Sequence, residues 1–557
     1  MSSLRNYLDD ANKPKHQREQ ADPRQVKNNA GGFTFQVDDR ARLERFVILG
    51  TDGGTYYVSE RDLTKQNVDW LIELIKRDEN GMVIDRVSDI SYAGRALRND
   101  TAIFVLELVF QYGSPELKKQ ARNRFNSIVR TSTHLFTSNA FAEAMGGAWG
   151  RARKTAVQQW YTDKSPEQLA YQAVKYRQRD GWTHRDSFRL AHPTGVDQQV
   201  GNFIMGKGEV TAFGTGDVLT GFEAMKNANS VKNVLELLDA FPKLPWEAIP
   251  TQFHKEPDVW KKLFYNGQLS GQALVRNITR LSRIGAFKDM VFAAEYAAKL
   301  TDEEMIQKTR LHPFNYLNAL IVHQHGQIPR NPTRASVHYG SDGIPRLKDW
   351  NTVPVILDAL NEGFYEAFKY VEPSRKRTSI NLDVSGSMRA PASGLDMSCA
   401  EAGAAMAMAI ARSEPYYVVN GFSDGNPRAG YNWHRDVLVD LGISPGMNLT
   451  QVLKKTRDQN FGRTNCALPM TNALRDRVEI DTFVVLTDNE TWHGKIHPHV
   501  ALREYRQKMG IDAKLVVVAM TATEFTIADP TDQGMLDVIG MDASVPKLIS
   551  EFAKGEF

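Results

Sequence analysis

The sequence predicts a chain with two kinds of structure, a long all-helical part followed by a doubly wound α/β domain. Its 557 residues exceed the roughly 250–300 at which a single hydrophobic core stops growing, so at least two domains are expected. Between about Leu63 and Leu360, apolar residues recur at intervals of three and four, as helices require. After Tyr370, short apolar runs alternate with helical patterns, which is typical of a parallel sheet covered by helices.

The helical part contains helices of modest length joined by short breaks. Trp70, Leu71 and Leu74 mark one apolar face, and Ser165 before Pro166 predicts the start of another helix. Short connections between such helices favour an α-solenoid or helical array, although the sequence contains no exact repeat. This part is expected to span residues 29–370, after a flexible N-terminal tail of residues 1–28.

Residues 371–557 are expected to form the α/β domain, which begins with a short basic linker. Its continuous apolar runs suit strands that are buried on both faces of a sheet. The predicted strands are Thr378–Asp383, Tyr416–Phe422, Thr482–Thr487 and Lys514–Met520. The predicted helices are Met397–Arg412, Leu449–Arg457, Val500–Lys508 and Val545–Ala553.

The composition excludes several classes of protein. With 42% hydrophobic and 24% charged residues, the chain is globular rather than disordered. No apolar run approaches the ~18 residues of a membrane helix, and Met1–Lys27 lacks the apolar core of a secretion signal. A cytoplasmic protein without a membrane partner is therefore expected. Two cysteines, Cys399 and Cys466, are too few for a disulfide framework.

Oxygen-bearing side chains gather where the predicted strands of the α/β domain end. Asp383, Ser385 and Ser387 occupy alternate positions after the first strand, at the edge where open α/β sheets bind ligands. Thr464 lies in a later loop, and Asp488 directly follows the third predicted strand. Hard oxygen donors of this kind suit one divalent cation, with Mg²⁺ preferred and Mn²⁺ as the alternative. The competing interpretation is that the aspartates and serines only cap helices and turns.

A second candidate site is a basic stretch within the helical part. Lys118–Leu190 carries 14 basic and 5 acidic residues, a net charge of +9 in a chain whose total is +3. This excess favours a polyanion on one surface, and a solvated helical face is the alternative. Cations interleaved with aromatic and histidine side chains are typical of sites for single-stranded RNA. The candidate contacts are Arg122, Arg124, Arg130, Arg151, Arg153, Lys154, Lys175, Tyr176, Arg177, Arg179, His184, Arg185 and Arg189.

The spacing of these residues predicts how they are presented. Lys175 and Arg179 are expected one turn apart on one helical face, and His184 is expected to be partly exposed after a helix break. An isolated histidine is more often structural, so the competing expectation is a buried His184. Trp149 and Trp182 are expected to anchor the core rather than to stack on bases.

Several dense strings of glycine, aromatic and charged residues occur in the helical part. They are Gly54-Thr55-Tyr56-Tyr57, Gly147-Ala148-Trp149-Gly150-Arg151, Lys175-Tyr176-Arg177-Gln178-Arg179 and Gly181-Trp182-Thr183-His184. Together with the strand-end motif, these strings resemble the Ro ribonucleoprotein autoantigen family and its bacterial relatives, over about residues 29–557. That family pairs a TROVE module with a von Willebrand factor A-like domain.

The resemblance implies a fold and a set of ligands. The fold would be a ring of HEAT-like helical repeats closed by the A-like domain. Asp383, Ser385, Ser387, Thr464 and Asp488 match the five positions of a metal-ion-dependent adhesion site, whose open coordination position takes an acidic residue of a protein partner. Arg463 and Asn465 depart from the residues that are frequent beside the threonine, which puts the metal affinity in question.

The function implied by the resemblance is non-catalytic RNA binding. The partners would be small noncoding Y-type RNAs on the outer surface and the ends of misfolded RNAs in the ring's hole, with a 3′ exonuclease tethered through RNA. The protein would act as a monomeric scaffold in RNA quality control. Two alternatives remain open, a metal-dependent hydrolase and a protein-docking module without an RNA role. The hydrolase is disfavoured because two-metal sites usually cluster more carboxylates than this motif offers.

Overall fold

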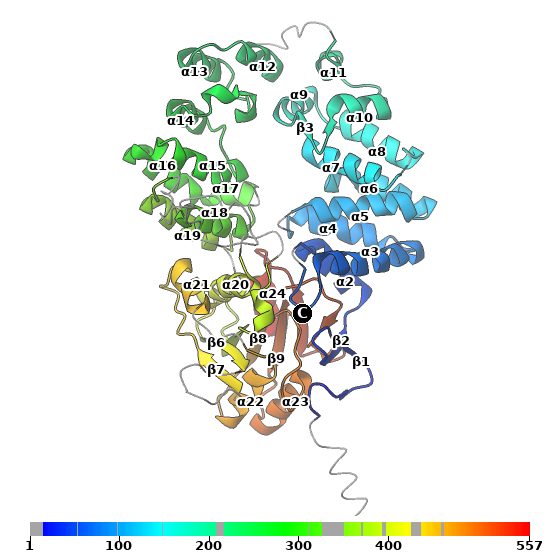
Figure 1. The fold of residues 1–557 in the computed structure, drawn as a ribbon, viewed down its shortest axis with the longest axis vertical. Coiled ribbons are helices and arrows are strands. Elements are labelled where there is room, and N and C mark those ends of the chain that lie inside the picture. The colour runs from blue at the N-terminus through cyan, green and yellow to red at the C-terminus, as the bar shows by residue number, and fades with distance from the viewer. Residues whose placement is uncertain are drawn as a thin grey trace, which may run out of the picture. The chain divides into compact units, whose positions relative to one another are not determined.

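The computed structural model describes residues 15–52, 54–96, 98–147, 149–207, 217–309, 311–325, 350–368, 371–392, 397–424, 436–457 and 462–556. These residues form two compact units (Figure 1). The α/β unit comprises Met1–Leu71, Arg95–Leu97 and Phe368–Phe557, and the helical unit comprises Ile72–Gly94 and Arg98–Ala367.

The helical unit consists of helices that pack on their near neighbours in the sequence. The first part contains α4 (Met82–Ala93), α5 (Asp100–Tyr112), α6 (Pro115–Ile128), α7 (Ser132–Ala144), α8 (Arg151–Thr162), α9 (Pro166–Lys175), α10 (His184–Ala191) and α11 (Gln198–Met205). The second part contains α12 (Val218–Lys226), α13 (Val231–Ala240), α14 (Pro257–Tyr265), α15 (Gln272–Arg283), α16 (Met290–Leu300), α17 (Glu303–Thr309), α18 (Pro313–His325) and α19 (Pro354–Glu366).

The order of packing is that of a helical array. Helix α4 packs on α6, α5 on α7, α6 on α8 and α8 on α10, so each helix touches the next but one in the chain. Figure 1 shows these helices following one another in colour order from α4 to α10. The predicted array of short helices is therefore confirmed. Closure of the array into a ring by the α/β domain stays a prediction.

Local sequence signals determine where α9 begins and ends. Ser165 caps the helix, since its hydroxyl accepts from the Gln168 backbone N–H while the Gln168 side chain accepts from the Ser165 backbone N–H. The helix ends at Lys175, and a hairpin of β3 (Gln178–Arg179) and β4 (Trp182–Thr183) follows. Asp180 and Gly181 form its two-residue turn with φ values of 52° and 81°, the left-handed geometry that such turns need.

The α/β unit is built on a six-stranded sheet with the order β11-β9-β8-β5-β6-β7. Its strands are β5 (Thr378–Asp383), β6 (Tyr417–Asp424), β7 (Asp436–Asp440), β8 (Thr482–Thr487), β9 (Lys514–Ala519) and β11 (Met535–Ile539). All neighbours pair in parallel except β6 and β7, so β7 is an antiparallel edge strand. The four predicted strands are confirmed within two residues, and β7 and β11 are additions that the apolar pattern did not predict.

Helices cover this sheet. They are α20 (Cys399–Ser413), α21 (Leu449–Arg457), α22 (Leu468–Arg475), α23 (Pro498–Met509) and α24 (Val545–Lys554). Helix α20 is rich in alanine and almost entirely buried against β5 and β6. Small side chains let it approach the sheet closely: a Cβ at Gly403 would lie 3.3 Å from the Leu382 side chain. The doubly wound α/β architecture that the sequence predicts is confirmed.

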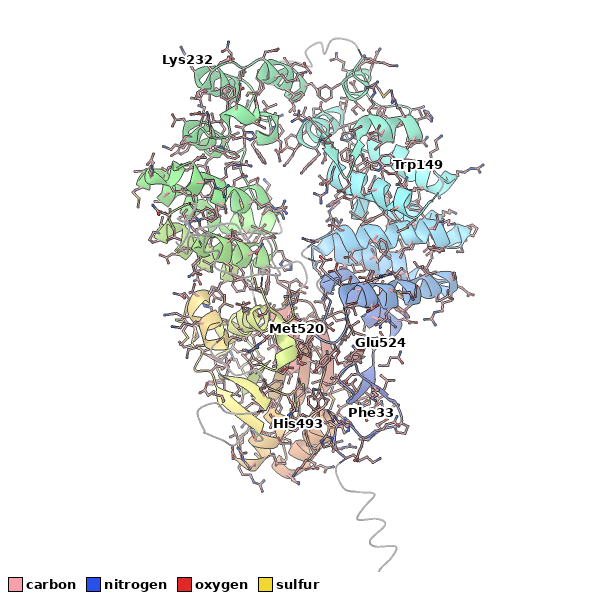
Figure 2. The ribbon with its side chains drawn as sticks, viewed as in Figure 1. Phe33, Trp149, Lys232, His493, Met520 and Glu524 are labelled. Carbon is pink, nitrogen blue, oxygen red and sulfur yellow. The ribbon has the colours of Figure 1, made fainter. Side chains whose placement is uncertain are left out.

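The N-terminal segment belongs to this compact unit. Strands β1 (Gln25–Lys27) and β2 (Phe33–Gln36) form an antiparallel sheet with β10 (Phe525–Thr526). Figure 2 labels Phe33 on β2 and Glu524 beside β10. The expected tail is therefore ordered from Lys15 onward, and residues 1–14 lie outside the described part. Residues 29–71 belong to the same compact unit as the α/β domain and not to the helical unit.

Buried hydrogen bonds hold the N-terminal segment against the rest of the α/β unit. The Arg45 side chain of α2 (Asp39–Leu49) is 1% exposed, donates to both carboxylate oxygens of Asp537 at 2.7 Å, and also donates to the Phe525 carbonyl. Gln17 is fully buried and donates to Asn465 Oδ1 and to the Ile496 carbonyl, both at 2.8 Å. Each of these hydrogen bonds gives a buried donor an acceptor.

Gln17→Ala is expected to destabilise the α/β unit by about 1–2 kcal/mol, because it removes the buried hydrogen bonds that Gln17 makes with Asn465, Ile496 and Thr491. Thermal unfolding followed by circular dichroism measures this loss. Gln20→Ala is the matched control, since Gln20 is an exposed glutamine of the same segment. Equal melting temperatures for the two variants would contradict the anchoring role of Gln17.

Candidate metal centre and nucleic-acid interface

The first candidate site lies in the loop that follows β5. Asp383 is the last residue of the strand and is fully buried, and the Ser385 backbone N–H donates to its Oδ1 at 2.9 Å. The Ser385 and Ser387 hydroxyl oxygens lie 3.0 Å apart and are buried. Alternate positions of this turned loop therefore present one carboxylate and two hydroxyls together, as the sequence predicts.

Two other segments complete the group. Asp488 directly follows β8, the parallel neighbour of β5, and the Thr487 hydroxyl donates to Asp383 Oδ2 at 2.7 Å. The loop that carries Thr464 is tied to the first loop by a hydrogen bond from the Gly386 N–H to the Gly462 carbonyl at 3.0 Å. The three segments meet because parallel strands end at one edge of the sheet.

The carboxyl groups at this site have raised pKa values, as carboxyls do when they are buried close to one another. Burial and the nearby Asp488 raise the pKa of Asp383 to about 7. Burial also raises the pKa of Asp488. A further carboxyl, Glu490, has its pKa raised to about 8 by burial and by Asp488. Buried carboxyls of this kind are stable as anions only beside a positive charge.

The donor set fits one hard cation that keeps some of its water. The Thr464 hydroxyl oxygen is buried and has no hydrogen-bond partner among the described residues, as an oxygen held for a ligand would. Among the same residues, no three His, Cys, Asp or Glu side chains converge on one point, so a cation here would depend on the hydroxyls. Asp383, Ser385, Ser387, Thr464 and Asp488 are the residues that could hold it.

Arg463 and Asn465, the two residues that depart from the expected motif, make different contacts. Asn465 accepts the hydrogen bond from Gln17, so its amide holds the N-terminal segment in place. The Arg463 guanidinium lies 6.0 Å from the centre of the Trp492 ring. Asn465 is thus explained by an anchoring contact that local sequence could not reveal.

Tyr57 of the Gly-Thr-Tyr-Tyr string lies within electrostatic range of the carboxyls of the candidate metal site, which sequence reasoning missed. Its pKa is raised to about 12, first by burial and also by the charges of Asp488, Glu490 and Asp383, while a hydrogen bond with Trp492 lowers it. The side chain is 37% exposed. The string is part of the α/β unit.

The predicted RNA contacts differ in exposure. Six are exposed: Arg124, Arg151, Arg177, Arg179, Arg185 and Arg189. Five are half-buried: Arg122, Arg130, Lys154, Lys175 and Tyr176. Two are buried: Arg153 and His184. The basic stretch is therefore not one uniform solvated face.

The structure corrects the expected exposure of His184. The side chain is 5% exposed, its Nδ1 lies 2.9 Å from the Tyr161 hydroxyl, and its Nε2 lies 3.0 Å from the Ser132 hydroxyl. The Phe136 ring packs edge-on at 4.9 Å between centroids, and Trp160 and Tyr161 pack around it. Burial lowers the pKa of His184 to about 3, so it is a neutral core residue.

Arg153 is also built into the core. It is 3% exposed and donates to Glu107 at 2.8 Å and to Asn139 at 2.9 Å. Its guanidinium stacks on the ring of Trp149, 4.3 Å from the centroid. A buried cation needs a buried counter-charge, and Glu107 supplies it. Because its side chain is buried, Arg153 is not an exposed phosphate contact.

Other cations of the set have protein partners. Arg130 donates to the Ser91 hydroxyl and the Ser127 carbonyl, and Arg124 forms an exposed ion pair with Asp85. Trp149 and Trp182 are half-buried, with ring centres 6.3 Å apart, so neither is the fully buried anchor that the sequence predicts.

The expected helical face of Lys175 and Arg179 is wrong, because α9 ends at Lys175 and Arg179 lies in the β3–β4 hairpin. Lys175 packs against Tyr171 and Tyr176. Burial lowers the pKa of Lys175, but Tyr176, Tyr171 and Glu247 together hold it above its ordinary value.

Arg179 instead belongs to a group of arginines from distant parts of the helical unit. The pKa of Arg276, an exposed residue of α15, is lowered by burial and by the nearby charges of Arg179 and Arg98. Sequence reasoning gave no role to Arg276 and missed Arg98. The charges of Arg179 and Arg98 both reach Arg276, which adds to the positive potential of this part of the helical unit and favours an anion.

The fold and these sites define a class of protein in which an array of short helices is combined with a von Willebrand factor A-type domain that has a strand-end oxygen cluster. The chain belongs to the Ro60 family. The model of the TROVE domain matches residues 26–233 and 242–376, and the model of the Ro60 vWA domain matches residues 377–553.

Relatives match the chain along its length. The RNA-binding protein RO60 of Deinococcus radiodurans is 36% identical over 568 residues, which covers 100% of both chains. The RNA-binding protein RO60 of Caenorhabditis elegans is 31% identical and covers 96% of this chain and 90% of its own. The crystal structure of the Deinococcus radiodurans RO (RSR) protein superposes with a TM-score of 0.66 at 35% identity, covering 93% of this chain and 100% of that one. The described part of the chain contains no helix long and apolar enough to cross a membrane.

Proposed function

We propose that this protein binds RNA through its helical unit. The observation that carries the proposal is the set of exposed arginines in the basic stretch, Arg177, Arg179 and Arg185 among them, with Arg276 close enough to Arg179 for that charge to lower its pKa. Phosphates would relieve the repulsion within this group and release counter-ions. The full-length relatives from two organisms are named RNA-binding proteins, which supports the same function.

The RNA partners we propose are small noncoding Y-type RNAs and the single-stranded ends of misfolded RNAs. Exposed Arg177, Arg179 and Arg185 suit phosphates, and Tyr176 and Trp182 are exposed enough to stack on bases. The protein would act in the cytoplasm as a monomeric scaffold in RNA quality control, with a 3′ exonuclease tethered through the bound RNA.

We propose a separate docking role for the strand-end cluster. Asp383, Ser385, Ser387 and Thr464 would hold one Mg²⁺ or Mn²⁺, with Asp488 binding directly or through water. The unpaired Thr464 oxygen and the raised pKa of Asp383 support this ligand set. A cation held by few carboxylates keeps a position for the carboxylate of an acidic protein partner.

The protein is proposed to be non-catalytic. Support comes from the donor set, in which hydroxyls outnumber carboxylates, whereas a two-metal hydrolase usually clusters carboxylates around both ions. Incubating the protein with labelled structured RNA and Mg²⁺ separates the candidates. Salt-sensitive binding without cleavage supports RNA binding, cleavage would establish the hydrolase, and absence of binding would leave only the docking role.

Neutralising the exposed hairpin cations tests where RNA binds. The double variant Arg177→Gln with Arg179→Gln is expected to weaken RNA binding about tenfold and to lower the slope of log affinity against log salt by about two. Filter binding at several salt concentrations measures both quantities. Lys232→Gln with Lys299→Gln is the matched control, since both lysines lie in ion pairs on other helices of the helical unit. An unchanged slope in the first variant would refute this placement.

A further inference from the structure

A cavity of 520 Å³ opens in the helical unit between α5, α6 and the start of α8. Its wall carries five cationic side chains and one acidic side chain, Glu107. The cations are Lys118, Lys119, Arg122, Arg151 and Arg153. Because Glu107 is already paired with Arg153 at 2.8 Å, the remaining charge of the wall is strongly positive.

Arg153 lines this cavity and is itself almost fully buried. Its Nε donates to Glu107 and its Nη2 to Asn139, and Trp149, labelled in Figure 2, covers the face of the guanidinium. The third nitrogen, Nη1, is buried and has no hydrogen-bond partner among the described residues. A buried cationic N–H without an acceptor is uncommon, and an anionic ligand would satisfy it.

Two further groups of donors line the same space. The Nε of Arg122 is also buried without a partner in the described part of the chain. Helix α8 begins at the cavity wall, and its N-cap Gly150 offers no side chain to accept from the N–H groups of the first turn. The open N–H groups and the positive end of the helix dipole attract anions, and phosphate above all.

We propose that this cavity is a phosphate-binding site, in which one phosphate group lies at the α8 N-terminus between Arg122 and Arg153 Nη1. The volume exceeds that of a phosphate alone, so a phosphate ester with its nucleoside attached would fit. The source is either the RNA chain, in which case the inference rests on the proposed function, or a free nucleotide. The site is distinct from the group of Arg98, Arg179 and Arg276, none of which lines this cavity.

Two variants remove the site in different ways. Arg122→Gln removes one charge from the cavity wall. Gly150→Asp places a carboxylate at the α8 N-terminus, where it can accept from the same N–H groups and repel phosphate. The backbone of Gly150, with φ −60° and ψ 158°, accepts any residue, and a Cβ there would meet no atom within 4 Å. This variant should fold as stably as the wild type or better.

The matched control is Arg124→Gln, which makes the same change two residues away on α6. Arg124 is exposed, pairs with Asp85 at 2.9 Å and does not line the cavity. Calorimetric titration of the full chain with inorganic phosphate and with AMP is expected to show binding to wild type and control. Arg122→Gln should weaken it at least fivefold, and Gly150→Asp should abolish it without lowering the melting temperature. Absence of binding to the wild type, or equal binding to all variants, would overturn the proposal.

RNA titrations on the same proteins identify the source of the phosphate. If Arg122→Gln weakens RNA binding at least fivefold more than Arg124→Gln, the cavity holds a phosphate of the RNA chain. If Arg122→Gln and Arg124→Gln bind RNA equally while Arg122→Gln alone binds AMP at least fivefold more weakly, the cavity serves a free nucleotide. A wild type that binds AMP but no RNA would refute the proposed function and leave the phosphate site standing.

Discussion

His184→Ala is expected to destabilise the protein by about 3 kcal/mol, because it empties a core position and removes two buried hydrogen bonds. The imidazole lies between the Tyr161 and Ser132 hydroxyls, which would both lose a partner, and against the Phe136 ring. Chemical denaturation followed by tryptophan fluorescence measures the loss. Arg185→Ala is the control, since Arg185 is the exposed neighbour and should cost little.

The pH dependence of this loss gives an independent check. The pKa of folded His184 is about 3, against an ordinary value of 6.5, so between these pH values the unfolded chain binds a proton that the folded chain does not. The stability that His184 contributes is therefore complete above pH 6.5 and falls as the pH falls toward 3. The gap between wild type and His184→Ala should narrow over that window. A constant gap, or a loss of RNA binding without a loss of stability, would contradict the core assignment.

Mg²⁺ is expected to stabilise the wild type and to have no effect on Asp383→Asn. An ion that binds only the folded state adds about 2.7 kcal/mol at a hundredfold excess over its dissociation constant. The variant removes a fully buried carboxylate from the ligand set and relieves its repulsion with Asp488. In the presence of a chelator, the variant should therefore be at least as stable as the wild type. Thermal unfolding of the wild type and of Asp383→Asn, each with Mg²⁺ and with a chelator, gives the four melting temperatures to compare.

Asp440→Asn is the matched control, because Asp440 is an exposed carboxylate of the same unit. It should respond to Mg²⁺ as the wild type does. An equal response of Asp383→Asn, or no response of the wild type, would refute the ligand assignment. The affinity of Asp383→Asn for RNA should stay within about twofold, under ~0.5 kcal/mol, and a larger loss would couple the metal centre to RNA binding.

The parts of the fold that follow from local pattern could be predicted from the sequence. Thr482–Thr487 and Lys514–Ala519 could be predicted as strands because strands buried on both faces are continuous apolar runs. The same pattern predicts that the oxygen-bearing side chains meet, since parallel strands end at one edge. Short strands such as β1 and β10 could not be predicted, because two or three residues carry no pattern, and β10 also pairs with a strand far away in the chain.

Side-chain exposure in the helical unit could not be predicted, for a related physical reason. His184 and Arg185 are neighbours with similar flanking sequence, yet one is buried and the other exposed. The difference arises from Ser132 and Tyr161, which are contributed by other helices. Arg153 is likewise buried because Glu107 on α5 supplies its counter-charge. Charge density alone does not show which arginines are already paired.

The pairing of β2 with β10 constrains how the chain can fold during its synthesis. Arg24 bonds to Asp529, 505 residues later, so β2 can pair with β1 early but meets β10 only when almost the whole chain has left the ribosome. At about 5–20 residues per second, that interval lasts roughly half a minute to two minutes. The apolar residues of β2 and α2 stay unprotected for that time, while the helical array between them and β10 can form from contacts near in sequence. During that interval the nascent N-terminus is expected to be a target for chaperones, which bind exposed apolar segments.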